Sequence, residues 1–158
     1  DVVTWTGGNG RNIETGLMAN VASLGWTADG RAFFSATKTG EIFYQVYVSD
    51  GTFLHNISEN ARVDTFAVSS PVDERLALYT WNADRISVHD AQNHVLLDTE
   101  GQFRPAWSTD GALAFCRRAE NGWSLMLWDG VSLQEVQQGD WIYAQWESGS
   151  RIACVPPW

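Results

Sequence analysis

A repeated unit of about 40 residues constrains this chain more than any other feature of its sequence. Two copies align over most of their length, one starting at Trp26 (WTADGRAFFSATKTGEIFYQVYVSDGT) and one starting at Trp107 (WSTDGALAFCRRAENGWSLMLWDGV). Each copy reads as Trp, a polar residue, an Asp-Gly turn, an apolar strand, a polar loop, a second apolar strand and a second Asp-Gly turn. A repeat of this length with about four strands is typical of β-propeller blades.

Two further copies extend the repeat over the whole chain. A short copy starts at Trp146, and a degenerate copy has Val68 in the position of Trp and two extra residues in the turn that follows. The four anchor positions, Trp26, Val68, Trp107 and Trp146, are separated by 42, 39 and 39 residues. The path from Trp146 through the two chain ends to Trp26 covers 38 residues. The 158 residues therefore make four whole periods.

Asp-Gly pairs punctuate the repeats at regular positions. Glycine readily adopts the positive φ that a tight turn between twisted strands requires, so we interpret these pairs as hairpin turns. Calcium ligands would need alternating carboxylates within one compact loop, whereas these Asp residues stand in separate hairpins. We therefore predict no metal site at the pairs Asp29-Gly30, Asp50-Gly51, Asp110-Gly111 and Asp129-Gly130.

The two ends of the chain complete one another in this pattern. The copy from Trp146 stops after two strands, and residues 1–17 read as the two strands that it lacks. Pairing the ends in one sheet removes exposed edges. The sequence predicts a single all-β domain, a four-bladed β-propeller of four-stranded antiparallel blades, with one blade shared between the N- and C-terminal segments. The predicted blades are 139–158 with 1–17, 18–58, 59–99 and 100–138.

The run WSTDGALAF from Trp107, followed by a loop, a strand and Asp-Gly, resembles the repeats of TolB-like propellers, whose blades are WD-repeat-like. The resemblance implies a propeller with a central channel and a binding face, and a periplasmic or extracellular location, but it does not specify a ligand. Propellers of this family are expected to have six or more blades. Three arrangements are therefore open: a small closed ring, a larger ring made with a second chain, and part of a longer array.

The recurring Trp and the two Cys residues are interpreted as packing residues. Trp26, Trp107 and Trp146 recur at a fixed register, which is typical of side chains that pack between blades rather than of a ligand platform. Cys116 and Cys154 fall on the second strands of adjacent blades, so both buried thiols and a disulfide between these blades remain open.

The composition and motifs argue against several classes of function. The net charge of −9 disfavours sequence-independent nucleic-acid binding, which depends on Lys and Arg. No run approaches the roughly 20 apolar residues of a membrane-spanning helix. The sequence contains no Gly-x-Ser-x-Gly, no His-Glu-x-x-His and no phosphate-binding loop. We therefore predict a protein that is not an enzyme and that requires no cofactor.

The expected binding surface lies on the loops between the second and third strands of the blades. Trp, Arg and charged residues gather there, as in protein interaction hot spots. The candidate binding residues are Trp81, Asp84, Arg117, Arg118, Glu120, Trp123 and Trp158.

The predicted function is a scaffold or interaction module that binds a protein or peptide, as a monomer or a homodimer. A carbohydrate-binding or glycan-processing propeller is one alternative, since exposed Trp rings can stack on sugars. An excised part of a larger propeller attached to an enzyme is another.

Overall fold

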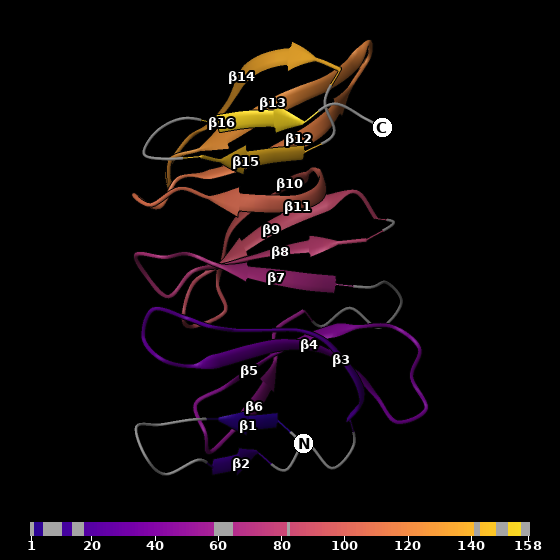
Figure 1. The fold of residues 1–158 in the computed structure, drawn as a ribbon, viewed down its shortest axis with the longest axis vertical. Coiled ribbons are helices and arrows are strands. Elements are labelled where there is room, and N and C mark those ends of the chain that lie inside the picture. Colours follow the sequence, from indigo (N-terminus) through magenta and orange to yellow (C-terminus); the bar gives the residue numbers. More distant parts are fainter. Residues whose placement is uncertain are drawn as a thin grey trace.

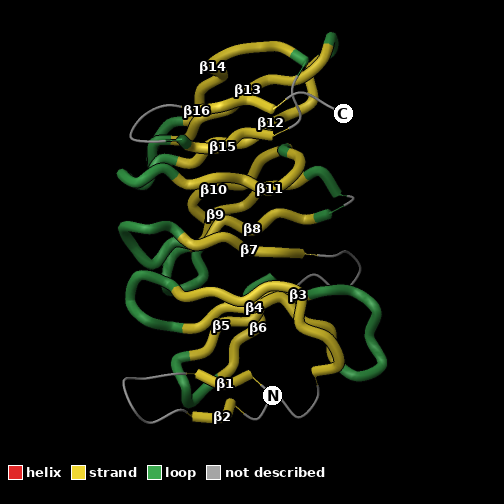
Figure 2. The backbone as a smooth tube through the Cα atoms, viewed as in Figure 1, coloured by secondary structure: helices red, strands yellow, loops and turns green. Residues whose placement is uncertain are grey.

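The computed structural model describes residues 2–4, 11–13, 18–58, 65–81, 83–140, 143–147 and 152–155. The regular secondary structure in these ranges consists of β-strands joined by turns and loops (Figure 2). The strands are β1 (Val2–Thr4), β2 (Arg11–Ile13), β3 (Met18–Trp26), β4 (Ala32–Lys38), β5 (Gln45–Ser49), β6 (Leu54–Asn56), β7 (Thr65–Ser69), β8 (Leu76–Thr80), β9 (Arg85–His89), β10 (Val95–Glu100), β11 (Gln102–Trp107), β12 (Leu113–Ala119), β13 (Gly122–Trp128), β14 (Leu133–Gly139), β15 (Tyr143–Trp146) and β16 (Ile152–Val155).

Three of the repeats fold as separate four-stranded antiparallel sheets. These are the β3–β6 sheet, the β7–β10 sheet and the β11–β14 sheet, and in each one the strands that follow one another in the chain are neighbours in the sheet. The all-β class and the four-stranded antiparallel unit predicted from the repeat are thus confirmed. The turn between the first two strands contains Gly30 in one sheet and Gly111 in another, with φ of +87° and +88°.

The sheets stack face to face along the long axis of the molecule (Figure 1). The β1–β2 hairpin lies at the end of the stack next to the β3–β6 sheet, and the β15–β16 hairpin lies at the other end with the β11–β14 sheet. Each hairpin is described as a two-stranded sheet of its own. Much of the expected shared blade lies outside the described residues, and its formation from the two hairpins stays a prediction.

Apolar side chains on both faces of each four-stranded sheet hold the stack together. All residues of β5 are buried, and so are six of the seven in β4. On β8, Leu76 and Leu78 pack toward the β3–β6 sheet, whereas Ala77 between them packs toward the β11–β14 sheet. At the next interface Cys116 and Ala144 belong to one buried cluster. The side chain of Cys154 lies outside the described residues, so a disulfide with Cys116 stays untested.

A tryptophan joins neighbouring sheets at two of the interfaces. The indole Nε1 of Trp107 donates a hydrogen bond to the main-chain oxygen of Val68, at 3.1 Å. The indole Nε1 of Trp146 donates to the main-chain oxygen of Ala106, at 2.9 Å. Trp26, the third anchor, is 42% exposed, and no described residue accepts a hydrogen bond from its indole.

The strand register corrects one anchor of the repeat. Trp107 pairs with Leu113, whereas in the β7–β10 sheet Ser69 pairs with Leu76. Ser69, and not Val68 as the sequence alignment predicts, therefore occupies the Trp position. The turn that follows is one residue longer than in the other sheets, rather than two. With this correction, both indole hydrogen bonds reach the residue that precedes the anchor of the previous sheet.

Replacing Trp107 tests the interface between the second and third four-stranded sheets. Trp107→Ala removes a partly buried aromatic side chain and its hydrogen bond, so we expect the free energy of unfolding to fall by about 3 kcal/mol. Urea unfolding followed by far-UV circular dichroism measures this change. The control is Val131→Ser, at a position that is 95% exposed, for which we expect a change within about 0.5 kcal/mol. Equal stability of the two variants would contradict the assigned role of Trp107.

Candidate functional site

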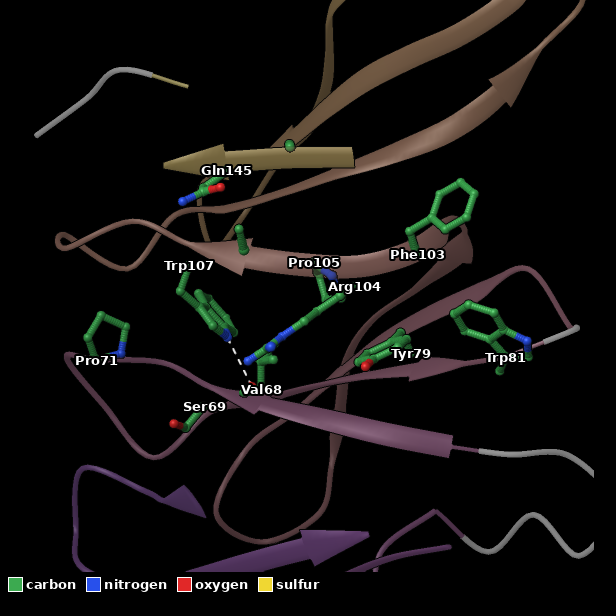
Figure 3. A pocket seen from close by; sticks show the side chains of 12 residues that line it. Val68, Ser69, Pro71, Tyr79, Trp81, Phe103, Arg104, Pro105, Trp107 and Gln145 are labelled. Atoms are coloured by element: carbon green, nitrogen blue, oxygen red, sulfur yellow. Dashed lines mark hydrogen bonds between the residues drawn. The ribbon is translucent and has the colours of Figure 1, made fainter. Parts of the chain in front are cut away.

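A cavity of about 730 Å³ opens between the second and third four-stranded sheets (Figure 3). It lies beside the first strands of three successive units, β7, β11 and β15, and we call it the inter-sheet groove. Each of these strands is the edge strand of its sheet. The groove is lined by Val68, Ser69, Pro71, Tyr79, Trp81, Phe103, Arg104, Pro105, Ala106, Trp107, Ala144 and Gln145.

Four aromatic residues give the groove its character. Tyr79 lies on β8 of the second four-stranded sheet and Trp81 in the loop between β8 and β9, and Phe103 and Trp107 lie on β11 of the third. Figure 3 shows Trp107 near one end and Trp81 near the other, with Tyr79 between them. Arg104 is the one charged residue of this lining, and it makes no ion pair with a described residue. The groove therefore combines flat apolar surfaces with a single guanidinium group.

Tyr79 is held in place by the ring of Phe66, its cross-strand partner in the same sheet. Its ring stacks on Phe66, with ring centroids 5.5 Å apart, and Phe66 in turn contacts Tyr44 at 5.7 Å. Burial raises the pKa of the Tyr79 phenol, and the charge of Arg104 offsets part of this rise. The phenol therefore stays neutral at physiological pH and can donate a hydrogen bond into the groove.

Phe103 reaches the groove from an unusual backbone conformation. Its φ is +62°, in the left-handed region that side chains other than Gly rarely adopt. The pairing of β11 with β12 is irregular between Gln102 and Ala106, and such a bulge redirects a side chain. The Phe103 ring packs against Trp123 of β13, with centroids 5.5 Å apart.

A smaller cavity of about 150 Å³ extends the groove toward the loop between β8 and β9. It shares Tyr79, Trp81 and Phe103 with the larger cavity and adds Asp84 and Gln102 to the lining. Three residues of the predicted binding face thus lie together: Trp81 and Asp84 line the cavities, and Trp123 supports Phe103.

The other predicted binding residues do not line the groove. Arg117 forms an ion pair with Glu135 at 3.7 Å. Arg118 and Glu120 are exposed on and after β12. Trp158 lies outside the described residues. The structure therefore gathers one part of the predicted loop face around the groove and leaves the rest on the surface.

Several groove residues were not predicted as binding residues because they lie in a strand and not in a loop. Phe103, Arg104 and Pro105 belong to β11, outside the loops from which the binding residues were predicted. Pro105 carried a usable signal, since proline within a strand indicates an edge strand that has no ladder partner for its nitrogen.

A charged cluster supports the wall of the groove behind Trp107. The guanidinium carbon of Arg75 lies 5.1 Å from the ring centroid of Trp107 and 5.2 Å from that of Trp128. Its ion pair with Asp73 has a distance of 2.6 Å, and it donates to the main-chain oxygen of Gly111 at 3.1 Å. Burial tends to raise the pKa of Asp73, but hydrogen bonds and the charge of Arg75 lower it below the ordinary 3.8.

No family model, curated protein or solved structure matches this chain. Within the described residues there is no group of three or more His, Cys, Asp or Glu side chains placed to hold a metal ion. The same part of the chain contains no helix long and apolar enough to cross a membrane.

Replacing Asp73 should change how stability depends on pH. Because the pKa of Asp73 is lower in the folded chain than in the unfolded chain, its contribution to stability is present above about pH 4 and is lost as pH falls through the folded pKa. We expect Asp73→Asn to be less stable than wild type between pH 5 and 7, with the difference shrinking below pH 4. Urea unfolding from pH 2 to 7 measures this.

The matched control is Glu74→Gln, which removes a neighbouring exposed carboxylate that has no ion pair among the described residues. A stability difference for Asp73→Asn that stays constant down to pH 2 would contradict the role assigned to the ion pair with Arg75.

Proposed function

We propose that this chain is a non-enzymatic interaction module that binds an extended peptide segment of a partner protein in the inter-sheet groove. The observation that carries the proposal is the lining of the groove, in which Tyr79, Trp81, Phe103 and Trp107 surround one exposed guanidinium, that of Arg104. Aromatic residues and Arg are the side chains that dominate binding energy at protein interfaces.

The size and the edges of the groove also favour a peptide. Its volume of about 730 Å³ lies within the range of sites that bury most of a small ligand or a few side chains. The first strands β7, β11 and β15 are edge strands, and such strands offer main-chain donors and acceptors to an extended segment. The peptide would thus be held by its backbone, while the aromatic rings select its side chains.

Charge limits the kind of partner. The chain has 19 acidic and 10 basic residues, so its net charge of −9 favours a partner that is neutral or basic overall. Arg104 is a positively charged residue in this acidic chain, and its guanidinium offers one position for a carboxylate or carbonyl oxygen of the bound segment.

We also propose that the stacked sheets are propeller blades of the TolB-like kind, with the β1–β2 and β15–β16 hairpins contributing to one further blade. The register supports this, since Trp146 pairs with Ile152 in the same way that Trp107 pairs with Leu113. The repeated indole hydrogen bond between sheets supports it as well. A periplasmic or extracellular location follows from this resemblance alone.

Peptide selection tests the proposed groove. A random peptide library displayed on phage is selected on the immobilised protein, and the best peptide is measured by calorimetry. We expect Phe103→Ala and Trp81→Ala each to weaken binding by about tenfold or more, since each removes an aromatic contact surface. The control Val131→Ser, on the exposed turn between β13 and β14, should leave binding unchanged.

Two results would contradict the proposal. One is failure to select any peptide, and the other is a selected peptide whose affinity is insensitive to both groove variants. A shift of the intrinsic Trp fluorescence with a panel of oligosaccharides, in the absence of peptide binding, would instead favour the carbohydrate-binding alternative.

A further inference from the structure

An apolar strip is exposed on the first strand of the β3–β6 sheet. Val21 is 49% exposed, Leu24 is 58% exposed and Trp26 is 42% exposed. All three belong to β3. Contiguous apolar surface of this kind is typical of a contact face.

The strip continues a buried surface on the same side of the sheet. Leu24 is directly opposite Phe34 in the strand pairing, so both side chains lie on one face. Phe34 and Tyr47 stack there with centroids 5.7 Å apart and are almost fully buried. Phe33, adjacent to Phe34, belongs to the cluster on the opposite face, toward the β7–β10 sheet. The exposed strip therefore faces away from the β7–β10 and β11–β14 sheets.

The two other anchors show what normally covers such a strip. Trp107 and Trp146 each pack on the first strand of the preceding unit and donate to a main-chain oxygen one residue before its anchor position. By the same register, the acceptor for the Trp26 indole would be the residue before the anchor of a preceding unit. In the β15–β16 hairpin, whose anchor is Trp146, that residue is Gln145.

The chain contains a hairpin with such an anchor, β15–β16, but this hairpin lies at the end of the stack opposite to the exposed strip. The β15–β16 hairpin repeats the first two strands of the unit, and it packs on β11 and β12. The β7–β10 and β11–β14 sheets lie between this hairpin and the exposed strip of its own chain (Figure 1). The β1–β2 hairpin, which the sequence predicts to be the third and fourth strands of the same unit, lies at the end next to the strip.

We infer that a second copy of this chain covers the strip with its β15–β16 hairpin. The main-chain oxygen of Gln145 of the partner subunit accepts the hydrogen bond from the Trp26 indole, and the contact continues the interface type already present twice within the chain. The partner's β15–β16 hairpin joins the β1–β2 hairpin to complete one four-stranded blade. Two copies joined at both ends give a ring of eight units, which lies within the usual range for propellers. This inference does not depend on what binds in the inter-sheet groove.

Sedimentation velocity over a range of protein concentrations tests the association. We expect a species of twice the chain mass, with a dissociation constant that rises about tenfold or more in Trp26→Ala, because a central aromatic contact is lost. Leu24→Ser alters the same strip at an exposed position and should weaken association in the same direction. Val131→Ser is the control, and circular dichroism checks that each variant is folded.

A photocrosslinking experiment identifies the occupant of the strip. Chains with benzoylphenylalanine in place of Trp26 are mixed with ¹⁵N-labelled wild-type chains and irradiated. We expect crosslinks from position 26 to residues 143–146 of a chain with the other isotope label. A monomer at every concentration, crosslinks within one chain only, or association that neither Trp26→Ala nor Leu24→Ser weakens would overturn the inference.

Discussion

The apolar burial on both faces of the three four-stranded sheets is the constraint on which the rest of the structure depends. β4 and β5 are buried almost throughout, so neither face of their sheet can be left in water. Burial of apolar surface contributes about 25 cal/mol per Å², so leaving such faces in water would remove much of the free energy that drives folding. The sheets must therefore stack, and each sheet is stable only with its neighbours, as in other repeat proteins.

Apolar burial does not by itself determine how one sheet is positioned on the next. Directional contacts, such as hydrogen bonds between the sheets, determine this position. The indole hydrogen bonds of Trp107 and Trp146 fasten the first strand of one sheet to the first strand of the sheet before it. Arg75 adds a second contact by lying on Trp107 and Trp128 while it is paired with Asp73. Trp107 both contacts the neighbouring sheet and lines the inter-sheet groove. The way the two sheets stack therefore determines the shape of the groove.

The repeat predicted most of the fold, since its Asp-Gly turns and apolar strands obey local rules of backbone conformation. The prediction from the repeat was wrong where the turn sequence departs from the repeat. The turn after β7 differs in length from the others and carries no Asp-Gly pair, so the alignment placed Val68 where Ser69 belongs. The binding face was predicted from loop residues and thus included Trp81 and Asp84, but not Phe103. No sequence pattern predicts that a phenylalanine adopts a positive φ, because the residue type itself disfavours it.

The positive φ of Phe103 is unfavourable for its backbone, but it accompanies the placement of an aromatic ring in the inter-sheet groove. A left-handed residue with a large side chain costs about 1–2 kcal/mol, which every folded molecule bears whether or not the groove is occupied. Glycine or asparagine would suit the backbone better, and neither could provide the aromatic surface that packs on Trp123. Among related sequences, the amino acid at this position would therefore report on selection for the groove, independently of selection for folding.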